Sequence, residues 1–99
     1  MESDIRKENG KLVISVRGKL DTNTAPELEG RIREADSGET SAVLDIEGLD
    51  YISSAGLRIV LNLKKTMSSR GGDLVIRGAS DDVREIFDMT GFSDIITIE

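Results

Sequence analysis

The stretch Tyr51-Ile52-Ser53-Ser54-Ala55-Gly56-Leu57 marks the point where a loop turns into a helix. An apolar, strand-like run precedes it at Ala42-Val43-Leu44-Asp45-Ile46, and a strongly apolar segment with helical spacing follows it from Leu57 to Met67. The first N–H groups of a helix lack intrahelical partners and carry partial positive charge. A serine at this place either caps the helix or carries a phosphate that those N–H groups stabilise.

Length and composition limit the class of protein. The chain has 99 residues, which suits a single domain spanning residues 1–99, and it contains no Cys and no His. Thiol nucleophiles, Cys-based metal sites, histidine bases and Ser-His triads are therefore excluded. The lack of disulfides fits a reducing compartment. No apolar run reaches the roughly 20 residues that span a bilayer, and the acidic start Met1-Glu2-Ser3-Asp4 is unlike a secretory signal. We expect a cytoplasmic protein without a cofactor or metal of its own.

The charge balance bears on the choice of partner. Thirteen basic and 19 acidic residues give a net charge of −6, which argues against binding to nucleic acid or to an anionic membrane. The aromatic residues are only Tyr51, Phe87 and Phe92, too few for a base-stacking platform. The negative charge suits a chain that meets a protein partner, and it serves solubility equally well.

Hydrophobic periodicity predicts strands that alternate with helices. Asn9-Gly10 predicts a type I′ hairpin turn after a short strand near Ile5, and Gly18 is expected to end the second strand. The later elements are expected as a helix begun by Thr24 and Glu27 with capping-box spacing, a strand at Ala42–Glu47, a helix at Leu57–Met67, a strand at Asp73–Arg77, a helix capped by Ser80, and a strand at Ile95–Ile98. This order predicts an α/β fold: a mostly parallel sheet with an antiparallel N-terminal hairpin strand and helices packed on it.

Function in such a sheet usually lies in the loops after the carboxyl ends of the strands. Two of these loops carry polar side chains: residues 21–24 (Asp-Thr-Asn-Thr) and residues 51–54 (Tyr-Ile-Ser-Ser). If the second and third strands are sheet neighbours, the two loops come together. A carboxylate and a helix-terminal hydroxyl then share one surface.

The chain resembles a STAS domain, and in particular the bacterial anti-sigma factor antagonists. The resemblance covers nearly the whole chain. It rests on the turn Gly18-Lys19-Leu20-Asp21, the strand that ends near Asp45, the junction from Tyr51 to Leu57, and the late segment Phe87-Asp88-Met89-Thr90-Gly91-Phe92. In this order and at these spacings the segments are specific for the fold, and less specific for the role.

The family pattern at the junction is Asp-Ser-Ser/Thr-Gly-Leu, in which the first serine accepts a phosphate. Alignment on Gly56-Leu57 implies that Ser54 is the phosphoacceptor. Ser53 stands where the family often has Asp, and Ala55 stands where it often has Ser or Thr, so the chain departs from the pattern at both positions. Asp21 matches the acidic position in the loop after the second strand.

Partner switching is the function that the resemblance implies. The unmodified antagonist binds an anti-sigma factor that is also a serine kinase of the GHKL type, and this frees the sigma factor for RNA polymerase. The kinase uses ATP-Mg to phosphorylate the serine, which weakens the complex, and a PP2C-type phosphatase restores the active form. The partner-binding residues expected around Ser54 are Asp21, Thr22, Asn23, Tyr51, Ile52, Ser53, Ala55 and Gly56.

Several of these residues also have a plain structural interpretation. Most serines before a helix are N-caps, and this is the favoured role of Ser53. An aspartate in a turn usually binds its own backbone, which applies to Asp21. Gly56 is expected to let another backbone or a partner approach closely. Ile52 and Leu49, if exposed, would form the apolar part of the partner surface.

Other functions remain as alternatives. A STAS module outside sigma control, such as a stress-sensing scaffold or a lipid-transport regulatory subunit, would use the same fold with other partners. The small size of the chain favours the antagonist. An enzyme is disfavoured because His, Cys and a carboxylate cluster are lacking. A receiver domain would need an acidic pair after the first strand, an acceptor Asp at a strand end and a late Lys, and this set is missing.

Overall fold

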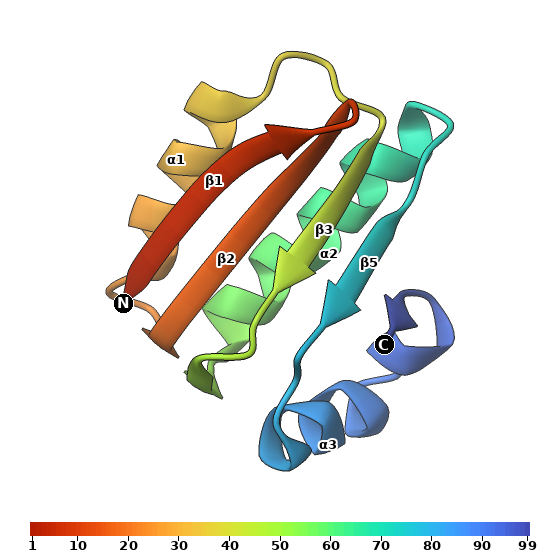
Figure 1. Ribbon diagram of the computed structural model, residues 1–99. Coiled ribbons are helices and arrows are strands. Elements are labelled where there is room, and N and C mark those ends of the chain that lie inside the picture. Colours follow the sequence, from red (N-terminus) through yellow and green to blue (C-terminus); the bar gives the residue numbers. More distant parts are fainter.

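The computed structural model describes residues 1–99 and consists of one sheet with its two longer helices on the same face (Figure 1). The helices are α1 (Ala25–Ala35), α2 (Ser54–Ser69) and α3 (Asp81–Met89), and a short 3₁₀ turn follows at Phe92–Asp94. The strands are β1 (Glu2–Glu8), β2 (Lys11–Leu20), β3 (Ser41–Asp45), β4 (Leu49–Ile52), β5 (Leu74–Arg77) and β6 (Thr97–Ile98). Helix α3 lies beyond the carboxyl end of β5.

The sheet is mixed, as the sequence predicts. The strand order is β1-β2-β3-β5-β6, and β4 pairs with β2 outside this path. Only β1 and β2 are antiparallel, and the remaining pairs are parallel. The hairpin turn at Asn9-Gly10 has φ values of 52° and 78°, which is the double positive φ of a type I′ turn. The predicted α/β fold with an antiparallel N-terminal strand is confirmed.

The prediction that Gly18 ends the second strand is wrong. The register shifts between Gly18 and Lys19, and β2 then continues to Leu20 beside a strand that the sequence analysis missed, β4. Gly18 has a φ of 87°, and its N–H donates to the carbonyl of Gly48 at 2.9 Å. Pairing with β3 ends at Ser15 opposite Asp45, and from Gly18, where a glycine lets the strand bend, β2 pairs with β4 instead.

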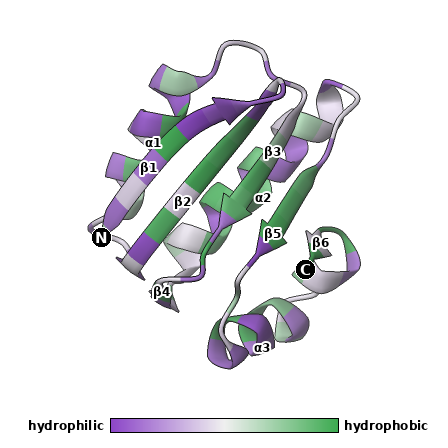
Figure 2. Cartoon of the chain, in the orientation of Figure 1, coloured by the Kyte–Doolittle hydropathy of each residue, from purple (hydrophilic) through white to green (hydrophobic).

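The core lies between the sheet and the two helices. Alternate residues of β2 point into it, since Leu12, Ile14 and Val16 are at most 1% exposed. Figure 2 shows the apolar stretches of the sheet strands side by side facing α2. From the helices, Leu28 of α1, Val60 of α2 and Phe87 of α3 are buried in the same core cluster. Packing against this core holds the strands in place, and with them the loops that follow their carboxyl ends.

The helix ends differ in part from the sequence-based expectation. Ser80 caps α3 as predicted, with its Oγ accepting from the N–H of Val83. Thr24 precedes α1, but the predicted capping-box bond is absent because its hydroxyl faces the preceding turn. Helix α2 begins at Ser54, at the serine junction where the sequence predicts the change from loop to helix. The last strand is shorter than predicted. Not one of the helices is both long and apolar enough to cross a membrane.

Candidate functional site

Two loops meet at the carboxyl end of the sheet. Strand β2 runs parallel to β4, with Lys19 opposite Tyr51 and Leu20 opposite Ile52. The N–H of Ser53 donates to the carbonyl of Leu20 at 2.9 Å, which ties the serine junction to the start of the 21–24 loop. The predicted meeting of the two loops is confirmed, and β4 brings it about by pairing directly with the end of β2.

The two serines of the junction have different structural roles. Ser53 is extended (φ −94°, ψ 176°) and is the N-cap of α2, since its Oγ accepts from the N–H of Gly56 at 3.4 Å. Ser54 is the first helical residue, is exposed, and makes no hydrogen bond through its side chain in this structure. The capping role predicted for Ser53 is confirmed, which leaves the hydroxyl of Ser54 free.

The start of α2 is favourable for a negative charge. The first intrahelical bond runs from the N–H of Leu57 to the carbonyl of Ser53, at 2.9 Å. The earlier N–H groups of a helix have no intrahelical partner and carry the positive end of the helix dipole. No acidic side chain occupies the first turn of α2. A phosphate on Ser54 would therefore meet positive rather than negative charge from its own helix.

The side chain of Asp21 binds the backbone of the turn that it begins. Its Oδ1 accepts from the N–H of Asn23 at 2.9 Å and from the N–H of Thr24 at 3.1 Å. The hydrogen bond from the Thr24 N–H, more than that from Asn23, holds the pKa of Asp21 below its usual range. Its carboxylate therefore stays ionised and fixes the loop, while Thr22 and Asn23 beside it are exposed.

Tyr51 is the exposed apolar side chain of the junction, at 48%. Ile52 and Leu49 are not exposed: they are 4% and 1% accessible, and both belong to the core. The expectation that Ile52 is exposed on the partner surface is wrong: both ends of β4 are buried, and Ile52 points into the core while Tyr51 beside it points outward. Ala55 is half-buried.

Gly56, another residue predicted to bind the partner, is buried at the start of α2 and not exposed. A Cβ at this position would lie 2.8 Å from Cγ1 of Ile52 and 2.9 Å from Cγ of Leu20. The expected close approach is real, but it comes from the side chains of β2 and β4. The missing side chain lets the start of α2 pack against the ends of these two strands.

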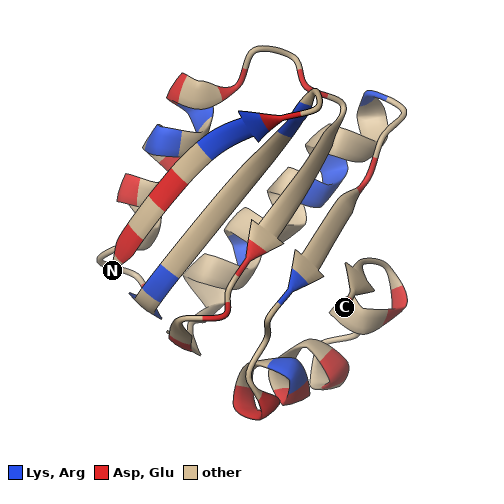
Figure 3. Ribbon diagram, in the orientation of Figure 1, with Lys and Arg blue, Asp and Glu red and all other residues tan.

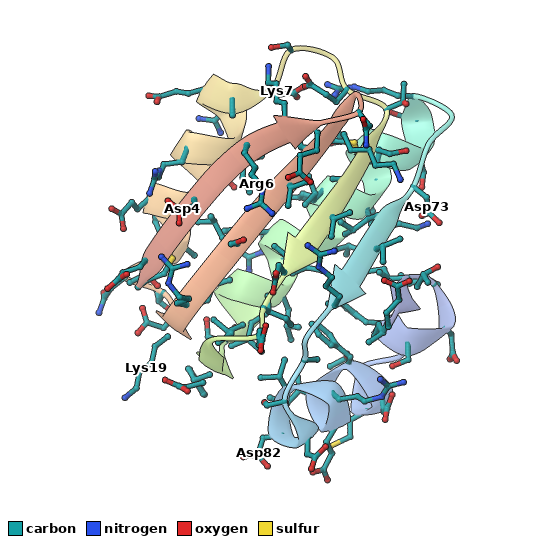
Figure 4. The ribbon with its side chains drawn as sticks, in the orientation of Figure 1. Asp4, Arg6, Lys7, Lys19, Asp73 and Asp82 are labelled. Carbon is teal, nitrogen blue, oxygen red and sulfur yellow. The ribbon has the colours of Figure 1, made fainter.

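Two basic residues near the junction were missed by the sequence analysis. Lys19 is exposed beside Tyr51, and Figure 4 shows it extending away from the end of β2. Arg58 is exposed one helical turn after Ser54. Neither cation forms an ion pair in this structure. The i, i+4 spacing of Ser54 and Arg58 is a signal that the sequence contains. The structure contains no group of three or more carboxylates arranged to hold a metal ion.

Two curated proteins are similar in sequence to this chain over most of its length. An anti-sigma-B factor antagonist of Listeria monocytogenes is 32% identical over 87 residues, which cover 87% of this chain and 76% of that protein. A Bordetella bronchiseptica protein named as a candidate anti-sigma factor antagonist, BtrV, is 37% identical over 99 residues, which cover 99% of this chain and 85% of that protein.

The fold has close structural neighbours as well. The crystal structure of a candidate anti-sigma factor antagonist from Thermotoga maritima superposes with a TM-score of 0.91 at 17% identity, covering 97% of this chain and 84% of that chain. The sequence profile of the STAS domain matches residues 2–99. On the sequence match, the shared fold and the junction at the start of α2, the chain belongs to the STAS domain family.

Proposed function

We propose that this chain is an anti-sigma factor antagonist controlled by phosphorylation of Ser54. Residues 1–99 act as one domain in the cytoplasm and catalyse no reaction themselves. In the unmodified form the chain binds an anti-sigma factor that is a GHKL-type serine kinase, and the sigma factor is released. The kinase transfers the γ-phosphoryl group of ATP to the Ser54 hydroxyl, with loss of ADP and a proton. A PP2C-type phosphatase removes the phosphate again.

One observation carries this proposal: the two adjacent serines are not equivalent. Ser53 uses its hydroxyl to cap α2, whereas Ser54 presents an exposed hydroxyl with no hydrogen bond to lose. A kinase must reach the hydroxyl and place it in line with the γ-phosphate, which an exposed residue at a loop–helix junction permits. The relatives named as anti-sigma factor antagonists support the choice of partner.

The proposed contact surface combines the 21–24 loop with the outer face of the serine junction. Its exposed members are Thr22, Asn23, Tyr51 and Ser54, and Lys19 lies beside them. Tyrosine is enriched at protein interfaces because it buries a large area while keeping a polar tip. Ile52 and Gly56 act from below this surface by fixing the start of α2.

The switch we propose is electrostatic and steric rather than conformational. A phosphoserine adds about −1.5 to −2 charges. Within the chain, the start of α2 stabilises this charge by about 0.3–1 kcal/mol. In the complex the same charge would be desolvated against the partner, at a cost of several kcal/mol. Because about 1.4 kcal/mol changes affinity tenfold, this cost is sufficient to dissociate the complex.

The test is a binding assay with substituted chains. Wild type, Ser54→Ala and Ser54→Asp are immobilised and offered the GHKL-type anti-sigma kinase of the same organism. We expect wild type and Ser54→Ala to retain the kinase and Ser54→Asp to lose it. Ser68→Asp is the matched control. Ser68 is exposed near the opposite end of α2, so this substitution adds the same charge away from the proposed contact surface and should retain the kinase.

Equal retention of the kinase by all three chains would contradict the phosphoswitch. Failure of every chain to bind an anti-sigma factor would favour a STAS module outside sigma control. Amide chemical shifts before and after phosphorylation test the mechanism: changes confined to residues 51–58 and the facing 21–24 loop are expected. Large changes across β5 and α3 would show a conformational switch instead.

A further inference from the structure

Arg58 differs from most arginines of this chain in having no partner. Arg6, Arg17, Arg33, Arg70 and Arg77 form ion pairs with carboxylates, and Arg31 donates to the backbone and hydroxyl of Ser3. Arg84 is also unpaired, but Asp81 and Asp88 lie one turn away from it on α3. No carboxylate lies one turn from Arg58 on α2, where its neighbours are Ser54, Ala55, Leu61 and Asn62.

The helix geometry places Arg58 over Ser54. Residues four apart on a helix have Cβ atoms about 5–6 Å from each other. Long side chains in a helix lean back toward its N-terminus, so a residue covers the turn that precedes it. Both residues are exposed, and Arg58 forms no ion pair in this structure. A guanidinium offers paired N–H donors that match the oxygens of a phosphate, which a lysine ammonium does not.

We propose that Arg58 binds the phosphate of phosphorylated Ser54 and so holds it along the first turn of α2. This inference rests on the proposed function in one respect only, the choice of Ser54 as phosphoacceptor. Arg58 is thus a regulatory residue of the modified state: it stabilises the phosphate dianion in a fixed position on the partner surface. In the unmodified chain it has no such role.

The test uses chains that carry phosphoserine at position 54 from synthesis, so that no kinase is needed. Phosphorus NMR follows the phosphate through its second ionisation in otherwise wild-type protein and in Arg58→Gln. We expect the pKa of the phosphate to be about 0.3 units higher in Arg58→Gln, from the typical strength of an i, i+4 ion pair. The difference should shrink at high salt, as for any exposed pair.

Two further chains make the result specific. Lys65→Gln removes one positive charge from an exposed position of the same helix, far from Ser54, and should leave the phosphate pKa unchanged. Arg58→Lys keeps the charge without the paired donors and should recover part of the shift. Equal phosphate pKa values in wild type and Arg58→Gln, or an equal rise in Lys65→Gln, would overturn the inference. The proposed function has a different failure: it is contradicted if the kinase phosphorylates a residue other than Ser54, whatever the result for Arg58.

Discussion

The amino end of the sheet and the two functional loops at its carboxyl end are held in opposite ways. At the amino end of the parallel strands, Arg70 of α2 binds both carboxylate oxygens of Asp36 at 2.8 and 2.9 Å and donates to the carbonyl of Glu39. Lys7 pairs with Glu39 across the same end, and Lys64 pairs with Asp73. Figure 4 shows Lys7 near the hairpin tip and Asp73 before the start of β5, and Figure 3 shows basic and acidic residues at this end of the sheet.

At the carboxyl end, the two functional loops carry no such links. Residues 19–24 and 50–58 form no ion pair at all. Their order comes from backbone bonds, the Asp21 turn and the Ser53 cap. The difference indicates a division of work: the amino end stabilises the fold, and the carboxyl end leaves Ser54, Tyr51, Lys19 and Arg58 free for a partner or a phosphate.

The largest expected effect lies at the amino end, in Gly72→Ala. A Cβ there would lie 1.7 Å from the carbonyl oxygen of Thr40, and a backbone atom cannot move aside cheaply. We expect the free energy of unfolding, measured in urea, to fall by more than about 3 kcal/mol. Gly30→Ala is the control, because its Cβ meets nothing within 4 Å and α1 should gain about 0.5–1 kcal/mol. Equal stability of Gly72→Ala and wild type would contradict the packing at this end.

Gly56→Ala makes the same change at the carboxyl end. Here the Cβ meets side chains, Ile52 at 2.8 Å and Leu20 at 2.9 Å, which can shift in part. We expect a loss of about 1–3 kcal/mol in the free energy of unfolding. The start of α2 should move, so amide shifts of residues 51–58 should change while those of the Arg70–Asp36 region stay. If Gly56→Ala lost as much unfolding free energy as Gly72→Ala, the carboxyl end would be packed as rigidly as the amino end, against this comparison.

The Arg70–Asp36 pair predicts a dependence of stability on pH. The hydrogen bonds from Arg70, followed by that from the Gly38 N–H, lower the pKa of Asp36 to about 2. A carboxyl group whose pKa is lower in the folded chain stabilises it above the unfolded pKa of 3.8, and this contribution is lost as the pH falls from about 4 to 2. Because the Asp36 side chain is 25% exposed, we expect about 1–2 kcal/mol.

Urea unfolding of Asp36→Asn measures this contribution. The variant should be less stable than wild type at pH 7 and should approach it in stability near pH 2. Asp50→Asn, an exposed change of the same charge in β4, should follow the wild-type curve. A constant difference between Asp36→Asn and wild type across the acidic range would show that the pair does not carry the effect.

The two serines give the smallest effects and the sharpest contrast. Ser53→Ala removes the N-cap and should lower the free energy of unfolding by about 0.5–1 kcal/mol, at the low end for a cap because the bond is 3.4 Å long. Ser54→Ala removes a hydroxyl without partners and should stay within about 0.5 kcal/mol of wild type. Thermal unfolding of the two variants under the same buffer conditions measures this difference. If Ser54→Ala were the less stable variant, Ser54 rather than Ser53 would be the cap of α2.

Much of the fold could be predicted from local patterns. The alternation in Leu12, Ile14 and Val16, the Asn9-Gly10 turn and the Ser80 cap are short-range signals, and the structure agrees with each. Strand β4 was missed because it has four residues, only its two ends are buried, and it exists by pairing with β2 beyond a bulge. That pairing is a long-range contact that no local pattern records.

The position of the site was predicted correctly, but not which of its residues are buried. The register from Gly56-Leu57 separated the serines, and the cap geometry agrees with the separation. Ile52 and Gly56 were assigned to the partner surface because the inward face of a missed strand cannot be inferred. Lys19 was missed for the same reason, since its place beside Tyr51 depends on β4.

The most direct test of the account is to locate the phosphate. The chain is incubated with its anti-sigma kinase and ATP-Mg, and the modified residue is read from peptide fragmentation in a mass spectrometer. Wild type and Ser53→Ala are predicted to carry one phosphate on Ser54, and Ser54→Ala to carry none. Phosphate on Ser53, or undiminished phosphate in Ser54→Ala, would contradict the claim that the free serine at the start of α2 is the switch.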